Sequence, residues 1–233
     1  GDYLDFEALY EALHTVVGDE DEFSGHASSR LRVLGVCYDI RHALMGDREI
    51  EFVDNGIDTD MMRYLSVITP EKNTYFKVNI FWPEILFVTM VLNDFVQVYA
   101  ATKAKGKDDV MLDKLTIWDE SIAYVRIFQA TVAKCIKETV SAASFSRMMN
   151  LMNKHYLCLA GYTTQYLDLL NFRFLQMSEE KRLKSISIIA KRLVEQDDEY
   201  KLIRSKVMDV AKEHKCSVMD INLELDFPDH IEW

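Results

Sequence analysis

Hydrophobic residues recur every three to four positions along most of the chain, the spacing that places them on one face of a helix. The first such segment is predicted to follow an N-cap at Asp5 and to run to about Val17. A second is predicted to be capped by Ser28 or Ser29 and to end at Gly46, which suits a left-handed C-terminal stop. Because its apolar residues occupy two sides, we expect this second helix to be sandwiched between layers.

Two short segments alternate polar and apolar residues instead, which predicts β-strands. They cover residues 48–53 and 74–82. Between them lie the strong turn signal of residues 54–56 and a short helical stretch over about 60–67. We expect the two strands to pair as a small antiparallel ribbon packed on the helices.

The rest of the chain is again patterned for helices. Pro83 suits the first turn of a helix that runs to about Lys103. Further helices are predicted over residues 116–140, 143–176, 179–195 and 198–214. The sequence therefore predicts an α-rich α+β fold, a helical bundle with a small antiparallel two-stranded ribbon near the N-terminal third.

The domain organisation follows from length and composition. A chain of 233 residues with 49% hydrophobic residues can bury a substantial core in one domain, so we predict a single domain over residues 1–233. Within it we expect an acidic helix and ribbon subregion (1–82), a helical bundle (83–215) and a C-terminal arm (216–233). Only three prolines and eight glycines interrupt the chain, which favours long helices.

Charge is distributed unevenly and narrows the choice of partners. The first sixty residues contain fifteen acidic residues and four arginines, which accounts for the whole net charge of −11. This balance disfavours nucleic acid, because phosphate binding needs clustered Lys and Arg. We also expect no membrane partner, since the most apolar run, residues 80–100, contains five proline, acidic or amide residues. Four widely spaced cysteines indicate reduced core thiols and a cytoplasmic location.

One candidate ligand-binding site combines Tyr38, Arg41 and His42 with Glu84. The first three form the densest polar cluster on an otherwise apolar helix, and Glu84 opens the helix that follows the ribbon. Perturbed charges in such a setting can mark a functional cleft. The competing interpretation is a structural ion-pair network, or an arginine whose stem covers apolar surface.

A second candidate is a polar stripe of Thr89, Asn93 and Gln97, spaced four residues apart on the helix from 83 to 103. Each buried and unpaired amide costs about 1–3 kcal/mol, so these side chains need partners if they are buried. We predict that they form a polar network or a subunit contact.

Metal ligation is the third possibility. The pairs Glu11-x-x-His14 and Asp39-x-x-His42 have the spacing of carboxylate-bridged di-iron bundles. Chance produces such pairs in a chain with 38 acidic residues and six histidines, and the first pair lies opposite the apolar face of its helix. We predict no metal site and no cofactor.

Function is predicted by elimination. The sequence lacks a phosphate-cradling glycine loop, a Gly-x-Ser-x-Gly turn and a recognisable Cys and His signature, which lowers the expectation of an enzyme. The leading hypothesis is a non-catalytic interaction or regulatory protein that self-associates and whose acidic N-terminal surface, including residues 19–22, meets a basic protein partner. The alternative is a small-molecule binding protein or enzyme with a pocket between the ribbon and the bundle.

Overall fold

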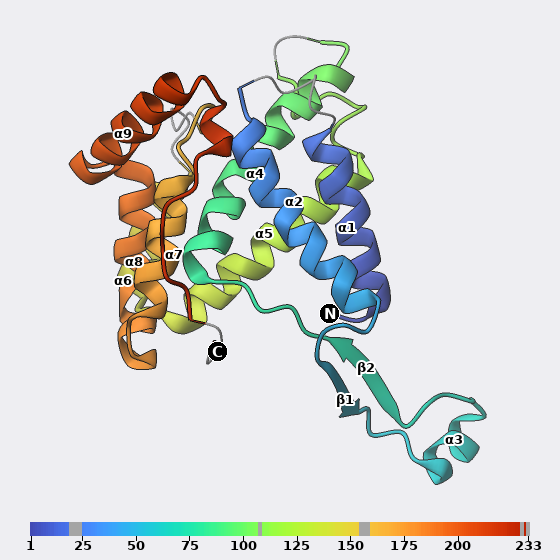
Figure 1. Cartoon of the computed structure of the whole chain (residues 1–233). Coiled ribbons are helices and arrows are strands. Elements are labelled where there is room, and N and C mark those ends of the chain that lie inside the picture. Colours follow the sequence, from blue (N-terminus) through green and yellow to red (C-terminus); the bar gives the residue numbers. More distant parts are fainter. Residues whose placement is uncertain (19–24, 107–108, 154–158, 229–230, 232–233) are drawn as a thin grey trace.

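The structure, a computed structural model, is an α-rich α+β fold in which a body of helices carries one small projecting sheet (Figure 1). It describes residues 1–18, 25–106, 109–153, 159–228 and 231. The predicted fold class is therefore confirmed. The helices of the body are α1 (Tyr3–Val17), α2 (Ala27–Leu44), α4 (Trp82–Lys103), α5 (Glu120–Thr139), α6 (Ala142–Met152), α7 (Gln165–Leu175), α8 (Glu179–Glu195) and α9 (Asp198–His214).

Two helix starts differ from the prediction. The N-cap of α1 is Asp2, whose carboxylate accepts a hydrogen bond from the Asp5 amide at 2.8 Å. The Asp5 carboxylate accepts in return from the Asp2 amide at 3.2 Å, so Asp5 is the third residue of a capping box rather than the cap. In α2 the N-cap position is occupied by His26, and Ser29 lies buried inside the helix, where its hydroxyl donates to the Leu159 carbonyl at 3.3 Å. The predicted serine cap is wrong because tertiary packing uses this hydroxyl.

The predicted helix over residues 143–176 is two helices, α6 and α7. Helix α6 ends at Met152, with Asn153 as its C-cap. Before α7 begins, Gly161 adopts a left-handed φ of 66° and donates its amide to the Gly25 carbonyl at 2.6 Å. This conformation favours glycine and is not that of a helix, so the single long helix is wrong. Helix α5 also begins later than predicted, at Glu120 after the N-cap Asp119.

The sheet consists of β1 (Ile50–Asp54) and β2 (Lys72–Phe76), antiparallel and in register from Ile50 opposite Phe76 to Asp54 opposite Lys72. Helix α3 (Thr59–Leu65) lies between the strands and is capped by Asp58. The second strand ends at Phe76, six residues before the predicted end.

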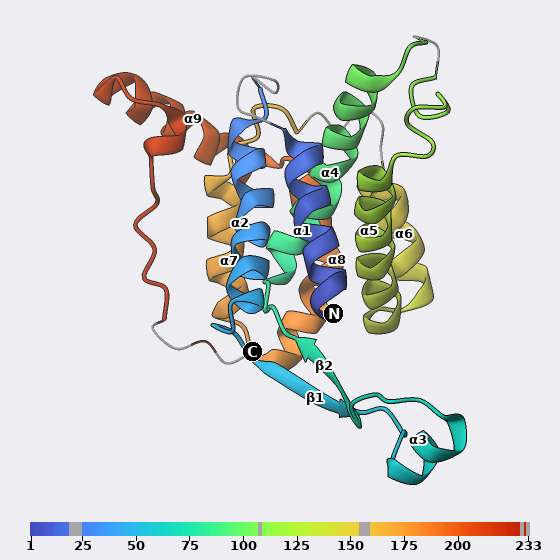
Figure 2. The same cartoon turned by 90° about the vertical axis from the view of Figure 1, so that its right-hand side faces the viewer.

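This arm, residues 50–76, projects from one end of the helical body, as Figures 1 and 2 show from two sides. All five residues of β1 are exposed. The arm meets the body at its base, where the Tyr3 and Phe76 rings lie 6.4 Å apart and the Phe76 amide donates to the Gly1 carbonyl at 2.8 Å. The expectation of a ribbon packed on helices is therefore wrong.

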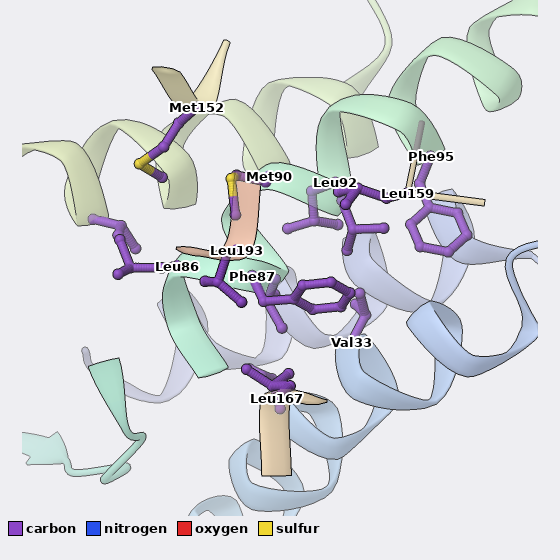
Figure 3. Packing of buried hydrophobic residues seen from close by; sticks show 14 of the residues in the cluster. Val33, Leu86, Phe87, Met90, Leu92, Phe95, Met152, Leu159, Leu167 and Leu193 are labelled. Atoms are coloured by element: carbon purple, nitrogen blue, oxygen red, sulfur yellow. The ribbon is translucent and has the colours of Figure 1, made fainter. Parts of the chain in front are cut away.

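Helix α4 forms the centre of the hydrophobic core. Figure 3 shows Phe87 of α4 surrounded by Val33 of α2, Leu167 of α7 and Leu193 of α8. By length and composition α4 could cross a membrane, and 61% of its most apolar stretch is buried inside the protein. Burial on several sides accounts for its apolar composition.

The C-terminal residues run along the outside of the helical body after α9. A short 3₁₀ turn (Val218–Asp220) is followed by extended backbone. The Gln165 side-chain amide of α7 donates to the Val218 and Ile221 carbonyls at 2.7 and 2.8 Å. Further along, the Phe227 ring meets Phe172 edge to face at 5.6 Å. These contacts attach the C-terminal segment to α7.

Candidate functional site

The predicted cluster near the end of α2 is a surface network. The Tyr38 and His42 rings lie 4.2 Å apart, and His42 Nδ1 is 2.8 Å from the Asp47 carboxylate. Next to them, Arg48 Nη2 donates to Asp39 at 2.7 Å. These interactions join the end of α2 to the segment that leads into the arm. They form the kind of structural network that was the alternative to a ligand-binding site.

Glu84 lies away from this network, so the four predicted ligand-binding residues do not converge. It contacts Arg32 of α2, which precedes His42 by ten residues, or about 15 Å along the helix at 1.5 Å per residue. Arg41 is exposed on α2. The described cavities lie elsewhere than between the arm and the body.

Glu84 instead belongs to a polar cluster between α2, α4 and α7. Arg32 Nη1 lies 3.6 Å from the Glu84 carboxylate, and Arg32 Nη2 donates to Asp168 at 2.7 Å and to the Thr164 carbonyl at 3.1 Å. Asn171 Nδ2 donates to Glu84 at 2.8 Å. Burial raises the pKa of Glu84, although Arg32 and Asn171 both favour its charged form. The Arg32 guanidinium thus interacts with two carboxylates.

A cavity of about 220 Å³ adjoins this cluster and is bounded by α2, α7 and the C-terminal segment. Arg32 and Asp168 line it together with Gln165, whose amide nitrogen is occupied by the C-terminal segment. The buried side-chain oxygens of Gln165 and Asn171 accept no hydrogen bond from any residue that the structure describes. The arrangement is polar, and its one guanidinium already interacts with two carboxylates.

The raised pKa of Glu84 predicts a pH effect on stability. Between its ordinary pKa near 4.5 and its higher value in the fold, the folded state keeps a proton that the unfolded state has lost. The contribution of Glu84 therefore falls as pH rises through this window. Urea unfolding at several pH values above 4.5 should give a less negative slope of stability against pH for Glu84→Gln than for the wild type. Parallel curves would contradict the assignment.

The polar stripe on α4 meets partners on α5. Asn93 Oδ1 accepts hydrogen bonds from Arg126 Nη1 and, at 3.1 Å, from Gln129 Nε2. Gln129 Nε2 also donates to the Thr89 carbonyl at 2.8 Å, and Arg126 Nη1 donates to Gln129 Oε1 at 2.7 Å. Thr89 and Asn93 are thus brought together in a polar network. Gln97 is exposed and lies outside it.

Arg126 and Gln129 are the residues that sequence reasoning missed. They lie three positions apart on α5 and therefore share one helix face. This spacing of two polar residues was the signal in the sequence that could have identified them. Both line a cavity of about 250 Å³ between α4, α5 and α6, here called the α4–α6 cavity. Its walls also include Thr89, Met90, Asn93, Ala130, Ala133, Ile136, Met149, Met152 and Asn153.

The end of the arm carries a second candidate surface. Five large apolar side chains of α3 and the following loop are exposed there, and Ile68 is fully exposed. We call them the tip surface: Met61, Tyr64, Leu65, Val67 and Ile68. Large exposed apolar side chains that gather into a contiguous patch often mark an interaction site.

Metal and thiol chemistry find little support in the part of the chain that the structure describes. No group of three or more His, Cys, Asp or Glu side chains there could hold a metal ion. Burial raises the pKa of the Cys37 thiol to about 12. Cys135 and Cys216 are exposed, so the prediction of core thiols is wrong for them, and Cys158 lies outside the described residues.

Comparison with known proteins places the chain in a family. Searches of curated proteins and of solved structures gave no match. A family model described as a domain of unknown function (DUF6904) matches residues 1–233. Since this match spans the whole chain, the protein belongs to the DUF6904 family.

Proposed function

We propose that this protein is a non-catalytic interaction protein that self-associates through the tip surface of its arm. The observation that carries the proposal is the exposure of five neighbouring apolar side chains at the end of a projecting element. Tyr64 is 84% exposed and Ile68 fully so. Contact of such side chains with water is unfavourable by about 25 cal/mol per Å² of apolar surface. Docking of a partner removes this contact.

The charge of the tip favours a second copy over a charged partner. Within residues 59–70 the charged side chains are Asp60 and Arg63, which pair at 3.3 Å. The neighbouring Asp58 carboxylate caps α3 by accepting from the Met61 amide at 2.8 Å. Residues 58–70 therefore carry a net charge of only −1, from Asp58 at the start of α3, which is a weak barrier to an identical surface and a weak attraction for a basic protein.

The area of the arm is compatible with a self-complementary interface. Aromatic side chains can bury about 150–250 Å² each, so Tyr64, which is 84% exposed, offers on the order of 170 Å². The other apolar residues of the tip surface add to this. A standard interface buries about 800 Å² per partner, and a two-fold axis would use the same patch on both copies.

The test is the mass in solution of Ile68→Glu compared with the wild type, by native mass spectrometry and light scattering. Each two-fold contact contains Ile68 twice, so burying two charges should weaken the dimer at least tenfold, which corresponds to about 1.4 kcal/mol. The matched control is Ile188→Glu on α8, where the wild-type isoleucine is 56% exposed. We expect the control to remain a dimer.

Two results would contradict the proposal. One is a wild-type monomer at all concentrations up to about 100 µM, which corresponds to a dissociation energy below about 5.5 kcal/mol. The other is a dimer that Ile68→Glu leaves intact. The wild-type dimer should also persist in concentrated salt, because salt screens contacts between charges and not apolar contacts.

The acidic surface proposed for a basic partner is a separate prediction. Its densest run, residues 19–22, lies outside the described residues. Neutralising these four acidic residues and comparing capture of a basic partner would test it. The tip surface does not depend on that result, since the two segments are separated along the chain by α2.

A further inference from the structure

The hydrogen-bonded residues of α4 and α5 form one part of the wall of the α4–α6 cavity, here called its polar end. They are Thr89, Asn93, Arg126 and Gln129. The remaining walls are mainly apolar, and they are formed by Met90, Ala130, Ala133, Ile136, Met149 and Met152. The cavity reaches solvent where Ala130 and Asn153 are exposed. Such a division suits a small amphipathic molecule better than a polar metabolite.

The positive charge at the polar end lacks a counter-ion. Arg126 is partly buried and uses Nη1 to donate to the side-chain oxygens of Asn93 and Gln129, both of which are neutral. No described carboxylate forms an ion pair with it. Burial lowers the pKa of Arg126, with no opposing carboxylate. A partly buried charge that has lost some of its hydration and faces no carboxylate would be stabilised by an anion.

The geometry of the polar end favours a carboxylate. Nε and Nη2 of Arg126 donate no hydrogen bond to a described residue, whereas Nη1 is held in place by Asn93 and Gln129. Gln129 is held in turn, because its Nε2 donates to the Thr89 carbonyl and to Asn93. The guanidinium is thereby oriented, and its remaining Nε and Nη2 donors match the two oxygens of a carboxylate.

The volume of the α4–α6 cavity limits the size of the ligand. A dry cavity of about 150 Å³ holds benzene with its six carbon atoms, so about 250 Å³ holds roughly ten non-hydrogen atoms. The single cationic side chain on the cavity wall matches one negative charge. A phosphate dianion would carry more negative charge than one arginine neutralises. A nucleotide would be too large for the cavity. We infer that the α4–α6 cavity binds a small monocarboxylate of about eight carbon atoms in all, with its carboxylate on Arg126 and its apolar tail of about seven carbon atoms against the methionines.

Titration calorimetry of the full chain with octanoate tests this, with octan-1-ol and octylamine as neutral and cationic probes of the same length. We expect one octanoate per chain with a dissociation constant below about 1 mM, which ten non-hydrogen atoms can supply. Octanol and octylamine should bind at least tenfold more weakly, because they lack the charge-assisted pair. No octanoate binding, or equal binding of the three probes, would overturn the assignment.

Variants locate the site. Arg126→Gln should weaken octanoate at least tenfold and remove the preference over octanol, whereas Arg147→Gln, an exposed arginine of α6, should change neither. Ala133→Leu keeps Arg126 and adds three carbon atoms to the cavity wall, so the full octanoate chain should no longer fit and its binding should weaken at least tenfold while circular dichroism stays unchanged. Full octanoate binding in folded Ala133→Leu would overturn the site. If Arg126→Gln does not fold, Ala133→Leu and the three wild-type titrations decide the question.

Discussion

Replacing Phe87 with alanine is expected to lower the free energy of unfolding by about 3–5 kcal/mol. Phe87 is fully buried in the N-terminal part of α4, and its ring lies 5.0 Å from that of Tyr162 in the segment that leads into α7. The Tyr162 ring in turn lies 4.8 Å from that of Tyr200 of α9, in a tilted arrangement. One side chain therefore links three parts of the helical body, and its removal leaves a cavity that none of them can close alone.

Urea unfolding measures the effect, with Phe52→Ala as the matched control. Phe52 is 63% exposed on the arm, so its replacement should change stability by less than about 0.5 kcal/mol. All proteins should be compared at one concentration, because self-association adds a concentration-dependent term. A loss below about 1 kcal/mol for Phe87→Ala would show that α4 is not the packed centre of the core.

Much of the fold could be predicted from periodicity and caps. Helices α8 and α9 have the predicted bounds, and Asp197 caps α9 as expected by accepting from the Tyr200 amide at 3.1 Å. Pro83 lies in the first turn of α4. These features are local, because a cap or a proline acts on residues within one helical turn.

The segment between α6 and α7 shows why periodicity fails elsewhere. Tyr162 and Tyr166 are buried and four residues apart, so they continue a helical pattern although Tyr162 precedes the helix. What fixes the backbone there is contact with distant residues. Gly161 bonds to Gly25, and the Thr163 amide donates to the Tyr200 hydroxyl at 3.1 Å. A pattern within one segment contains no information about such partners.

The same limit applies to the candidate sites. The stripe on α4 indicated that Asn93 needed a partner, but Arg126 lies 33 residues further along the chain. By contrast, Tyr38, Arg41 and His42 were grouped by closeness in sequence, and the structure places Arg41 on exposed surface while His42 binds Asp47. A polar residue on an apolar helix therefore predicts a hydrogen-bond partner for its side chain more reliably than it predicts a ligand-binding site.

Replacing Arg32 with methionine is expected to cost about 2–4 kcal/mol at neutral pH. Removing one partner of a buried pair costs about 3–5 kcal/mol, and the lower figure allows for the partial exposure of Arg32, Glu84 and Asp168. Methionine preserves the apolar part of the arginine side chain, so the loss of stability measures mainly the effect of removing the charge. Both carboxylates would remain, and each would face the other without the guanidinium that separates them.

The matched control is Arg41→Met, the same change on an exposed position of the same helix, which should cost less than about 0.5 kcal/mol. Adding Glu84→Gln to Arg32→Met should restore part of the lost stability, because it removes one of the two unpaired charges, so the two changes should be non-additive. Lower pH should act in the same direction, since protonation of Glu84 also removes that charge. Equal costs for Arg32→Met and Arg41→Met would mean that solvent, rather than Arg32, stabilises the two carboxylates.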